Sequence, residues 1–267
     1  MAQPEQVRRG SLSRYTARRI LTDFAARGLR PGDTLADEAT LVEQYGVSRG
    51  TLREALRLLG FLGVVTNRTG PPGGPRLTRP EPMVVGRTLG MVAQFQGATL
   101  RTVFETRLVV EPATASLAAV ARTDTDLQAL DAVVAAMRAT EERGGTEYAE
   151  NAVRFIVLVA EASHNAVFAT VVPALAAMTT TVPRTYARGR SELTELVTTI
   201  LEAIRSGDED LASCAAGRRI QSFVDDLGTH HPDELENPIL WPDLDEVLTG
   251  ERVHVYDRED RSIATRR

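Results

Sequence analysis

The chain has 267 residues, of which 43% are hydrophobic and 25% charged, with a formal net charge of −5. This balance is typical of a globular protein with a sizeable core and excludes a disordered or fibrous chain. The single cysteine, Cys214, excludes a disulfide framework and a cysteine metal site. Because there is no leader-like apolar region and no apolar run of roughly 18 residues, we expect a soluble cytoplasmic protein.

The charge is unevenly distributed along the chain. Residues 1–80 contain 13 Arg against 7 Asp and Glu residues, a balance of +6, while residues 81–267 carry −11. All 31 basic residues are arginine, so the choice of arginine over lysine at a position does not by itself indicate a role that requires arginine. A basic front joined to an acidic back predicts a polyanionic partner for the front only.

The first third of the chain has the pattern of a winged helix–turn–helix. Asp37 and Ser48 are suited to begin helices, and Gly28 and Gly46 are suited to end them. The expected elements are a disordered stretch at 1–12, helices at 13–26, 37–45 and 48–59, and two wing strands at 64–66 and 76–78 around a loop rich in glycine and proline.

The rest of the chain predicts an all-α bundle and a polar tail. Helices are expected at about 83–96, 99–121, 124–143, 146–163, 166–187, 191–206 and 208–227. The fold class is therefore mainly α. The domains are a winged-helix domain at 13–79, a linker at 80–83, a helical domain at 84–228 and an acidic tail at 229–267. For the tail, Val253 and Val255 leave a strand and disorder as alternatives.

The helix that begins at Ser48 carries a row of arginines. On an ideal helix, Arg49, Arg53 and Arg57 lie at about 0°, 40° and 80°, and the apolar face lies at about 240° to 340°. The core face therefore does not need the arginines. The tip of this helix combines a Ser cap, small residues, arginine and free N–H groups. Such a tip is suited to binding DNA, because Arg can donate two hydrogen bonds to guanine O6 and N7 while N–H and hydroxyl groups contact phosphate.

The alternative is a solvated face whose arginines pair with Glu54 and Glu43. The short turn before this helix and the glycine-rich wing after it form the helix–turn–helix arrangement. That context favours DNA binding.

Residues 18–78 resemble the winged-helix domain of the GntR family of bacterial transcription regulators. The resemblance is carried by LRPGDTLADEATLVEQYGVSRGTLREALRLLGFLGVV and the glycine-bearing wing. It differs at 36–39, where relatives carry a DNA-contacting arginine and this chain reads ADEA. The resemblance implies that the DNA contacts are Ser48, Arg49, Gly50, Thr51 and Arg53 on the helix and Arg68, Thr69 and Gly70 on the wing.

Residues 83–228 resemble the all-helical effector domain of the FadR subfamily, called FCD. Many relatives bind a metal there through one Asp and three His. The matching positions are Ala152, Ile156, Val197 and Arg219, none of which can bind a metal, so we expect no metal and no cofactor. The resemblance also directs Arg107 toward the effector site.

An inward-pointing Arg219 needs an anion or a carboxylate partner. It would grip an organic acid or an acyl or aromatic anion whose body lies on Ala152, Ile156 and Val197. The alternatives are an internal salt bridge for Arg219, an ion pair of Arg107 with Glu111 or Glu105, and a plain apolar core.

The sequence thus predicts a homodimeric regulator that binds a palindromic double-stranded operator and responds to a small anionic effector. Its rival is a DNA-binding dimer whose helical domain only dimerises. The sequence contains no nucleophile–base pair, Walker loop or dinucleotide fingerprint, so an enzyme is not expected.

Overall fold

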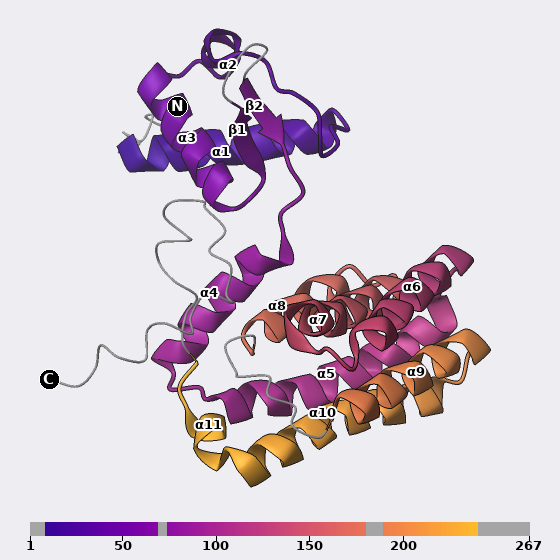
Figure 1. Cartoon of the computed structure of the whole chain (residues 1–267). Coiled ribbons are helices and arrows are strands. Elements are labelled where there is room, and N and C mark those ends of the chain that lie inside the picture. Colours follow the sequence, from indigo (N-terminus) through magenta and orange to yellow (C-terminus); the bar gives the residue numbers. More distant parts are fainter. Residues whose placement is uncertain (1–8, 69–73, 180–188, 240–267) are drawn as a thin grey trace, which may run out of the picture. The chain divides into compact units, whose positions relative to one another are not determined.

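The computed structural model describes residues 9–68, 74–179 and 189–239. The chain divides into two compact units, Met1–Val84 and Val85–Arg267. Figure 1 shows the first as a small helical unit with a two-stranded hairpin and the second as a helical bundle. The mainly α class, with one wing and one bundle, is confirmed.

The first unit packs three helices against a hairpin. They are α1 (Arg9–Ala26), α2 (Glu38–Tyr45) and α3 (Arg49–Phe61), followed by β1 (Val65–Arg68) and β2 (Gly74–Leu77). The strands are antiparallel, with Val65 opposite Leu77. Ile20, Leu52 and Leu59 are each at most 1% exposed, and this shared core fixes α3 between α1 and the wing.

The turn between α2 and α3 follows from three residues. The Asp37 side chain accepts a hydrogen bond from the Thr40 amide at 2.8 Å, which begins α2. Gly46 ends α2 in the left-handed conformation (φ 64°), where a side chain would be strained. Ser48 then accepts from the Thr51 amide at 3.2 Å and begins α3. These caps set the direction in which α3 leaves the unit.

The first helix is longer than its sequence pattern predicts. Residues 9–12, predicted to be disordered, form the first turn of α1. The Thr16 hydroxyl donates to the Leu12 carbonyl at 2.8 Å, and Ser13 and Thr16 are both buried. Small polar residues thus extend the buried face of α1, and a search for apolar spacing does not detect them.

The wing strands also extend beyond the predicted ranges, which stop at 66 and begin at 76. The amides of Gly32 and Leu35 donate to the carbonyls of Leu77 and Pro75 at 2.8 and 2.9 Å. The turn before α2 therefore covers the outer edge of β2, where Pro75, which has no amide hydrogen to donate, accepts through its carbonyl.

The second unit is built around α5. Its helices are α4 (Pro82–Phe95), α5 (Leu100–Ala121), α6 (Asp124–Thr140), α7 (Gly145–Ala162), α8 (Phe168–Ala177), α9 (Arg190–Ser206), α10 (Glu209–His230) and α11 (Pro232–Glu236). α5 contacts α7, α8, α9, α10 and α11, and α10 lies along α5 (Figure 1). Among the described helices, none combines the length and the apolar character needed to cross a membrane.

The predicted boundary at 228 is too early. α10 continues to His230 and α11 follows directly. Leu235 and Ile239 are 2% and 3% exposed. The Leu100 amide donates to the Asn237 carbonyl and the Ile239 amide donates to the Ala98 carbonyl, both at 3.1 Å. The described part of the predicted tail is therefore integral to the bundle, because its two apolar side chains fill the space beside the start of α5.

Two helices of the bundle end before their predicted limits. α6 stops at Thr140 rather than 143, and α8 runs from Phe168 to Ala177 rather than from 166 to 187. Residues 180–188 lie outside the described ranges.

Candidate functional site

The tip of α3 is an exposed polar surface. Ser48, Arg49 and Gly50 are exposed, and Thr51 is half-buried. The Ser48 hydroxyl lies 2.9 Å from the Thr51 hydroxyl and also caps the helix. Within the described residues, the amides of Arg49 and Gly50 have no hydrogen-bond acceptor. The tip thus presents two free N–H groups and the positive end of the helix dipole.

The three arginines of α3 differ in their pairing. Arg53 donates to Glu38 of α2 at 2.9 Å, with the two side chains 68% and 36% exposed. Arg57 pairs with Glu54 at 2.7 Å, as the solvated-face alternative predicts. Arg49 has no ion-pair partner in the part of the chain that the structure describes. Because exposed pairs contribute little, Arg53 can leave Glu38 for a stronger acceptor.

Of the three residues predicted to contact DNA from the wing, the structure describes one. Arg68 is the last residue of β1. Thr69 and Gly70 lie outside the described residues.

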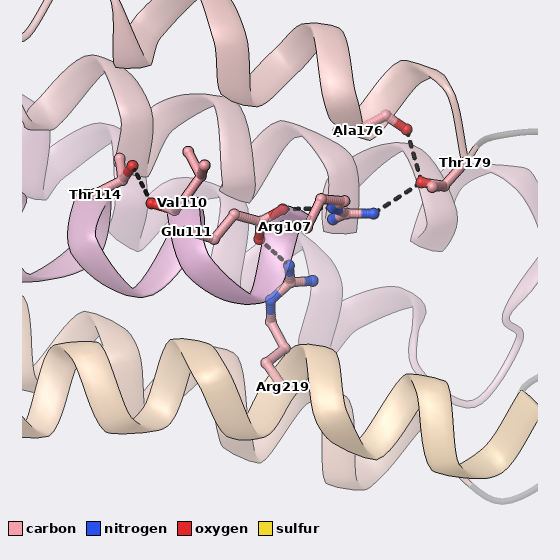
Figure 2. Close-up of polar contacts among 7 residues, drawn as sticks. All are labelled: Arg107, Val110, Glu111, Thr114, Ala176, Thr179 and Arg219. Carbon is pink, nitrogen blue, oxygen red and sulfur yellow. Dashed lines mark hydrogen bonds and ion pairs between the residues drawn. The ribbon is translucent and has the colours of Figure 1, made fainter. Parts of the chain in front are cut away.

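The bundle holds a second set of arginines, which we call the Arg–Glu–Arg cluster: Arg107 and Glu111 of α5 and Arg219 of α10. Arg107 Nε and Arg219 Nη2 each donate to a different oxygen of Glu111 at 2.5 Å. Arg107 also donates to the Thr179 hydroxyl at 2.8 Å. Figure 2 shows the carboxylate held between the two guanidinium groups. All three side chains of the cluster are at most 9% exposed.

The charges of this cluster do not cancel. Burial by itself raises the pKa of the Glu111 carboxyl, but the charges of Arg107 and Arg219 outweigh it and hold that pKa below its ordinary value. Glu111 is therefore ionised at neutral pH, and among the described residues two buried guanidinium groups share this one carboxylate. A second anion would be stabilised beside the two guanidinium groups.

A small cavity of about 20 Å³ adjoins the cluster. Such a volume has room for about one water molecule. Its lining residues come from several helices and are Glu111, Thr114, Ala115, Phe155, Ile156, Val159, Val172, Ile200, Ala216 and Arg219. The cavity is therefore lined by two charged residues, by one threonine and otherwise by apolar side chains.

The structure brings together some of the predicted effector residues and separates others. Ile156 and Arg219 line the cavity, and Arg107 reaches it only through Glu111. Ala152 and Val197 do not line the cavity but pack in the main hydrophobic core. The predicted internal salt bridge of Arg219 and the predicted pair of Arg107 with Glu111 both exist, and they share the carboxylate.

The positions that hold a metal in relatives do not fit one here. Ala152, Ile156 and Val197 offer no donor atom, and Arg219 places a positive charge on Glu111. A divalent cation would be repelled by this arrangement.

Sequence reasoning missed Thr179 and the bridging role of Glu111. The spacing of Arg107 and Glu111 is the helical i, i+4 spacing that predicts their pair. Nothing local predicts that Arg219, 108 positions further on, joins the same carboxylate.

A winged helix–turn–helix with an exposed arginine tip, followed by an all-helical unit, is the architecture of a two-domain DNA-binding regulator. Two family models match the chain: bacterial regulatory proteins of the gntR family at residues 12–72 and the FCD domain at residues 102–222. The matches together span more than half of the sequence. The chain belongs to the GntR family and carries an FCD domain.

Named relatives are transcriptional regulators, not enzymes. The chain is similar to LutR of Bacillus subtilis (strain 168), with 33% identity over 51% of this chain and 61% of LutR. It is similar to Mce2R of Mycobacterium tuberculosis, with 32% identity over 43% of this chain and 49% of Mce2R. The matched part thus spans about half to three-fifths of these curated relatives.

Among solved structures, a GntR protein of Streptococcus agalactiae has 25% identity and a TM-score of 0.63, covering 79% of this chain and 98% of that one.

Proposed function

We propose that the protein is a cytoplasmic transcription regulator that binds a palindromic DNA operator as a homodimer. One observation carries this proposal: the tip of α3 presents an exposed Arg49 beside two backbone N–H groups, and none of these has a partner within residues 9–68, 74–179 and 189–239. A cation and free donors on a convex helix tip match the phosphates and guanine edges of a major groove.

Each residue of the tip has a distinct part in this proposal. Arg49 and Arg53 contact base edges or phosphates, and the Ser48 and Thr51 hydroxyls donate to phosphate oxygens. Gly50 keeps the tip narrow enough for close approach. Arg68, Thr69 and Gly70 of the wing complete the contact in the adjacent minor groove.

The homodimer follows from the small size of this tip. One helix end and one wing offer few base contacts, whereas two symmetric copies on a palindrome multiply the affinity. Repression and activation are equally compatible with such binding.

The test is a titration of alanine variants against a duplex selected from a randomised pool by the wild-type protein. A lost bidentate base contact costs roughly 1–3 kcal/mol, and a dimer loses it twice. Arg49→Ala and Arg53→Ala should therefore each weaken binding by at least tenfold in a mobility-shift titration. Arg57→Ala is the matched control, because Arg57 is an exposed arginine of the same helix further from its tip.

Comparison of Arg49→Ala with Arg57→Ala shows whether the tip of α3 recognises DNA. If Arg49→Ala binds the selected duplex as tightly as Arg57→Ala does, the tip of α3 is not the recognition surface. Unchanged far-UV circular dichroism of each variant establishes that the fold is intact.

We further propose that a small anion with an apolar body binds beside Arg219 and modulates DNA binding. Support comes from the two guanidinium groups of the Arg–Glu–Arg cluster, which share one carboxylate among the described residues, and from the largely apolar lining of the cavity next to it. A charge-assisted pair with a guanidinium would orient the anion. Ile156 lines the cavity, so the apolar body of the anion would contact Ile156. Ala152 and Val197, which pack in the hydrophobic core, would support the residues that line the cavity without contacting the anion.

A specific observation favours the rival function, a helical domain that only dimerises. The cavity of about 20 Å³ is far smaller than the roughly 300–1,000 Å³ of typical ligand pockets. An effector in this cavity therefore requires the helices that line it to separate, and binding there would shift the protein between a closed and an open bundle.

Thermal shifts with short aliphatic acids, fatty acids and aromatic acids distinguish the two functions. An effector of the proposed kind raises the melting temperature of the wild type. Its affinity falls at least tenfold in Arg219→Met, which keeps the length but not the charge, while effector-free DNA binding is nearly unchanged. A stabilising acid whose affinity is untouched by Arg219→Met binds elsewhere, with Arg107→Met as the next test. If no acid stabilises the wild type, the rival function holds.

A further inference from the structure

The helix α4 has an exposed apolar face. Arg87 is its single charged residue. Five apolar side chains of α4 are 40% to 89% exposed: Val85, Leu89, Met91, Val92 and Phe95. Val85, Leu89 and Val92 follow the i, i+4, i+7 spacing of one helix face, and Met91 and Phe95 flank it. We call these five residues the α4 face. A contiguous patch of this kind marks an interaction site.

The opposite side of α4 is already in use. Gly86 and Gly90 are buried, and a Cβ placed on Gly86 would lie 3.4 Å from the backbone of Ala174 in α8. Ala93 packs with Leu175 and Ile239 in a small core. α4 is thus apolar on both sides but covered on one, whereas a helix that is apolar all round is normally buried all round.

The chain leaves the described residues beside the C-terminal end of α4. Ile239 is buried in the same core as Ala93, and its amide donates to the Ala98 carbonyl at 3.1 Å. Ala98 follows α4 by only three residues. Ile239 therefore lies close to the end of α4, and a segment that follows it in the chain has a high effective concentration next to that helix.

The sequence after Ile239 is complementary to such a face. In LWPDLDEVL, residues 240–248, Leu240, Leu244, Val247 and Leu248 recur at helical spacing. A proline near the start, three acidic residues and Gly250 after the run are typical helix start and stop signals. A helix of nine residues is about 13 Å long, and the α4 face from 85 to 95 is about 15 Å long. The acidic residues also match the positive charge of Arg87.

We propose that residues 240–248 of the same chain dock on the α4 face and cover it. The apolar residues of the segment, with Trp241, would contact Leu89, Val92 and Phe95, and its acidic residues would face solvent and Arg87. Since α4 leads from the first unit into the bundle, this segment would stabilise the helix that joins them. The proposal is independent of DNA and effector binding.

Trp241 makes the docking measurable, because it is the only tryptophan of the chain. In the full-length wild type, we expect its emission to be shifted to the blue of the urea-unfolded chain and its quenching by acrylamide to be several-fold weaker. Val92→Glu and Leu89→Glu place a charge in the α4 face and should move both quantities toward the unfolded values. Val120→Glu is the matched control: Val120 is 57% exposed and lies at the far end of α5 from the Ala98–Ile239 contact.

Three outcomes overturn the proposal. The first is a wild-type Trp241 as accessible to acrylamide as in urea. The second is shielding that Val92→Glu and Val120→Glu reduce equally. The third is shielding lost on dilution together with the dimer in sedimentation, which would assign the α4 face to a second copy. As a check that needs no folded glutamate variant, the chain truncated after Ile239 should bind more of an apolar dye than the full chain.

Discussion

Two groups of arginines in this molecule have opposite surroundings. At the tip of α3, Arg49 and Arg53 are exposed, and among the described residues Glu38, itself 36% exposed, is the only carboxylate that pairs with either of them. In the bundle, Arg107 and Arg219 are buried and share Glu111. The same side chain is thus exposed to solvent in one unit and paired with a buried carboxylate in the other.

The difference shows that residue type does not decide the role of an arginine in a chain whose 31 basic residues are all arginine. Burial and the number of carboxylates within reach decide it. An exposed pair is screened by water and salt, whereas a buried guanidinium without its carboxylate is strongly destabilising. The following predictions test this contrast, from the largest expected effect to the smallest.

Glu111→Gln should destabilise the bundle most. It leaves two buried guanidinium groups without a counter-charge, and breaking a buried ion pair costs about 3–5 kcal/mol. Urea unfolding followed by circular dichroism measures the loss. The control is Glu54→Gln, which removes the carboxylate of an exposed pair and should cost less than about 1 kcal/mol. Equal losses in the two variants would remove the contrast between the regions.

Acid should abolish part of the same stabilisation. The pKa of Glu111 is lowered in the folded protein from an ordinary 4.5. A carboxyl whose folded pKa is depressed contributes stability that is complete above the unfolded pKa and is lost as pH falls through the folded pKa. The difference in unfolding free energy between wild type and Glu111→Gln should therefore be constant near neutral pH and shrink below about pH 4.5. A difference that grows in acid contradicts this sign.

Ser48→Ala should destabilise the first unit by about 1 kcal/mol, because the Thr51 amide loses its cap. Thermal unfolding is the measurement. Ser48→Gly should lose only a few tenths of that energy, since glycine is tolerated at a helix start. If the alanine variant is as stable as wild type, the Ser48 cap at the tip of α3 does not contribute to the free energy of unfolding.

The smallest effect is expected for the pair of Arg53 and Glu38. A double-mutant cycle with Arg53→Ala and Glu38→Ala should give a coupling of about 0.2–1 kcal/mol that declines with added salt. A coupling above about 2 kcal/mol, insensitive to salt, would make this exposed pair behave like the buried one.

Much of the fold could be predicted from the sequence, because most of it is locally encoded. Asp37, Gly46 and Ser48 mark the ends of α2 and α3 through their own backbone and side-chain preferences, and the structure has these caps. The helices of the bundle follow from apolar spacing. The start of α1 at Arg9 was missed because its buried face uses Ser13 and Thr16 rather than apolar residues.

The long-range features could not be predicted. Leu235 and Ile239 are buried by contacts with the start of α5, well over a hundred residues earlier, so a local scan assigns them to a polar tail. The joining of Arg219 to Glu111 is equally non-local. At the α3 tip the arginine row follows from the spacing, the set of candidate residues follows from the family resemblance, and their contacts with DNA stay a prediction.

The backbone contact between residues 98–100 and 237–239 also has a consequence for folding kinetics. Two hydrogen bonds join the start of α5 to the last described residues of the bundle, and closing so long a loop is slow compared with forming the helices within it. We therefore expect the amides of Leu100 and Ile239 to gain protection from hydrogen exchange together and late during refolding. In the native state they would open as one cooperative unit, separately from the centre of α5.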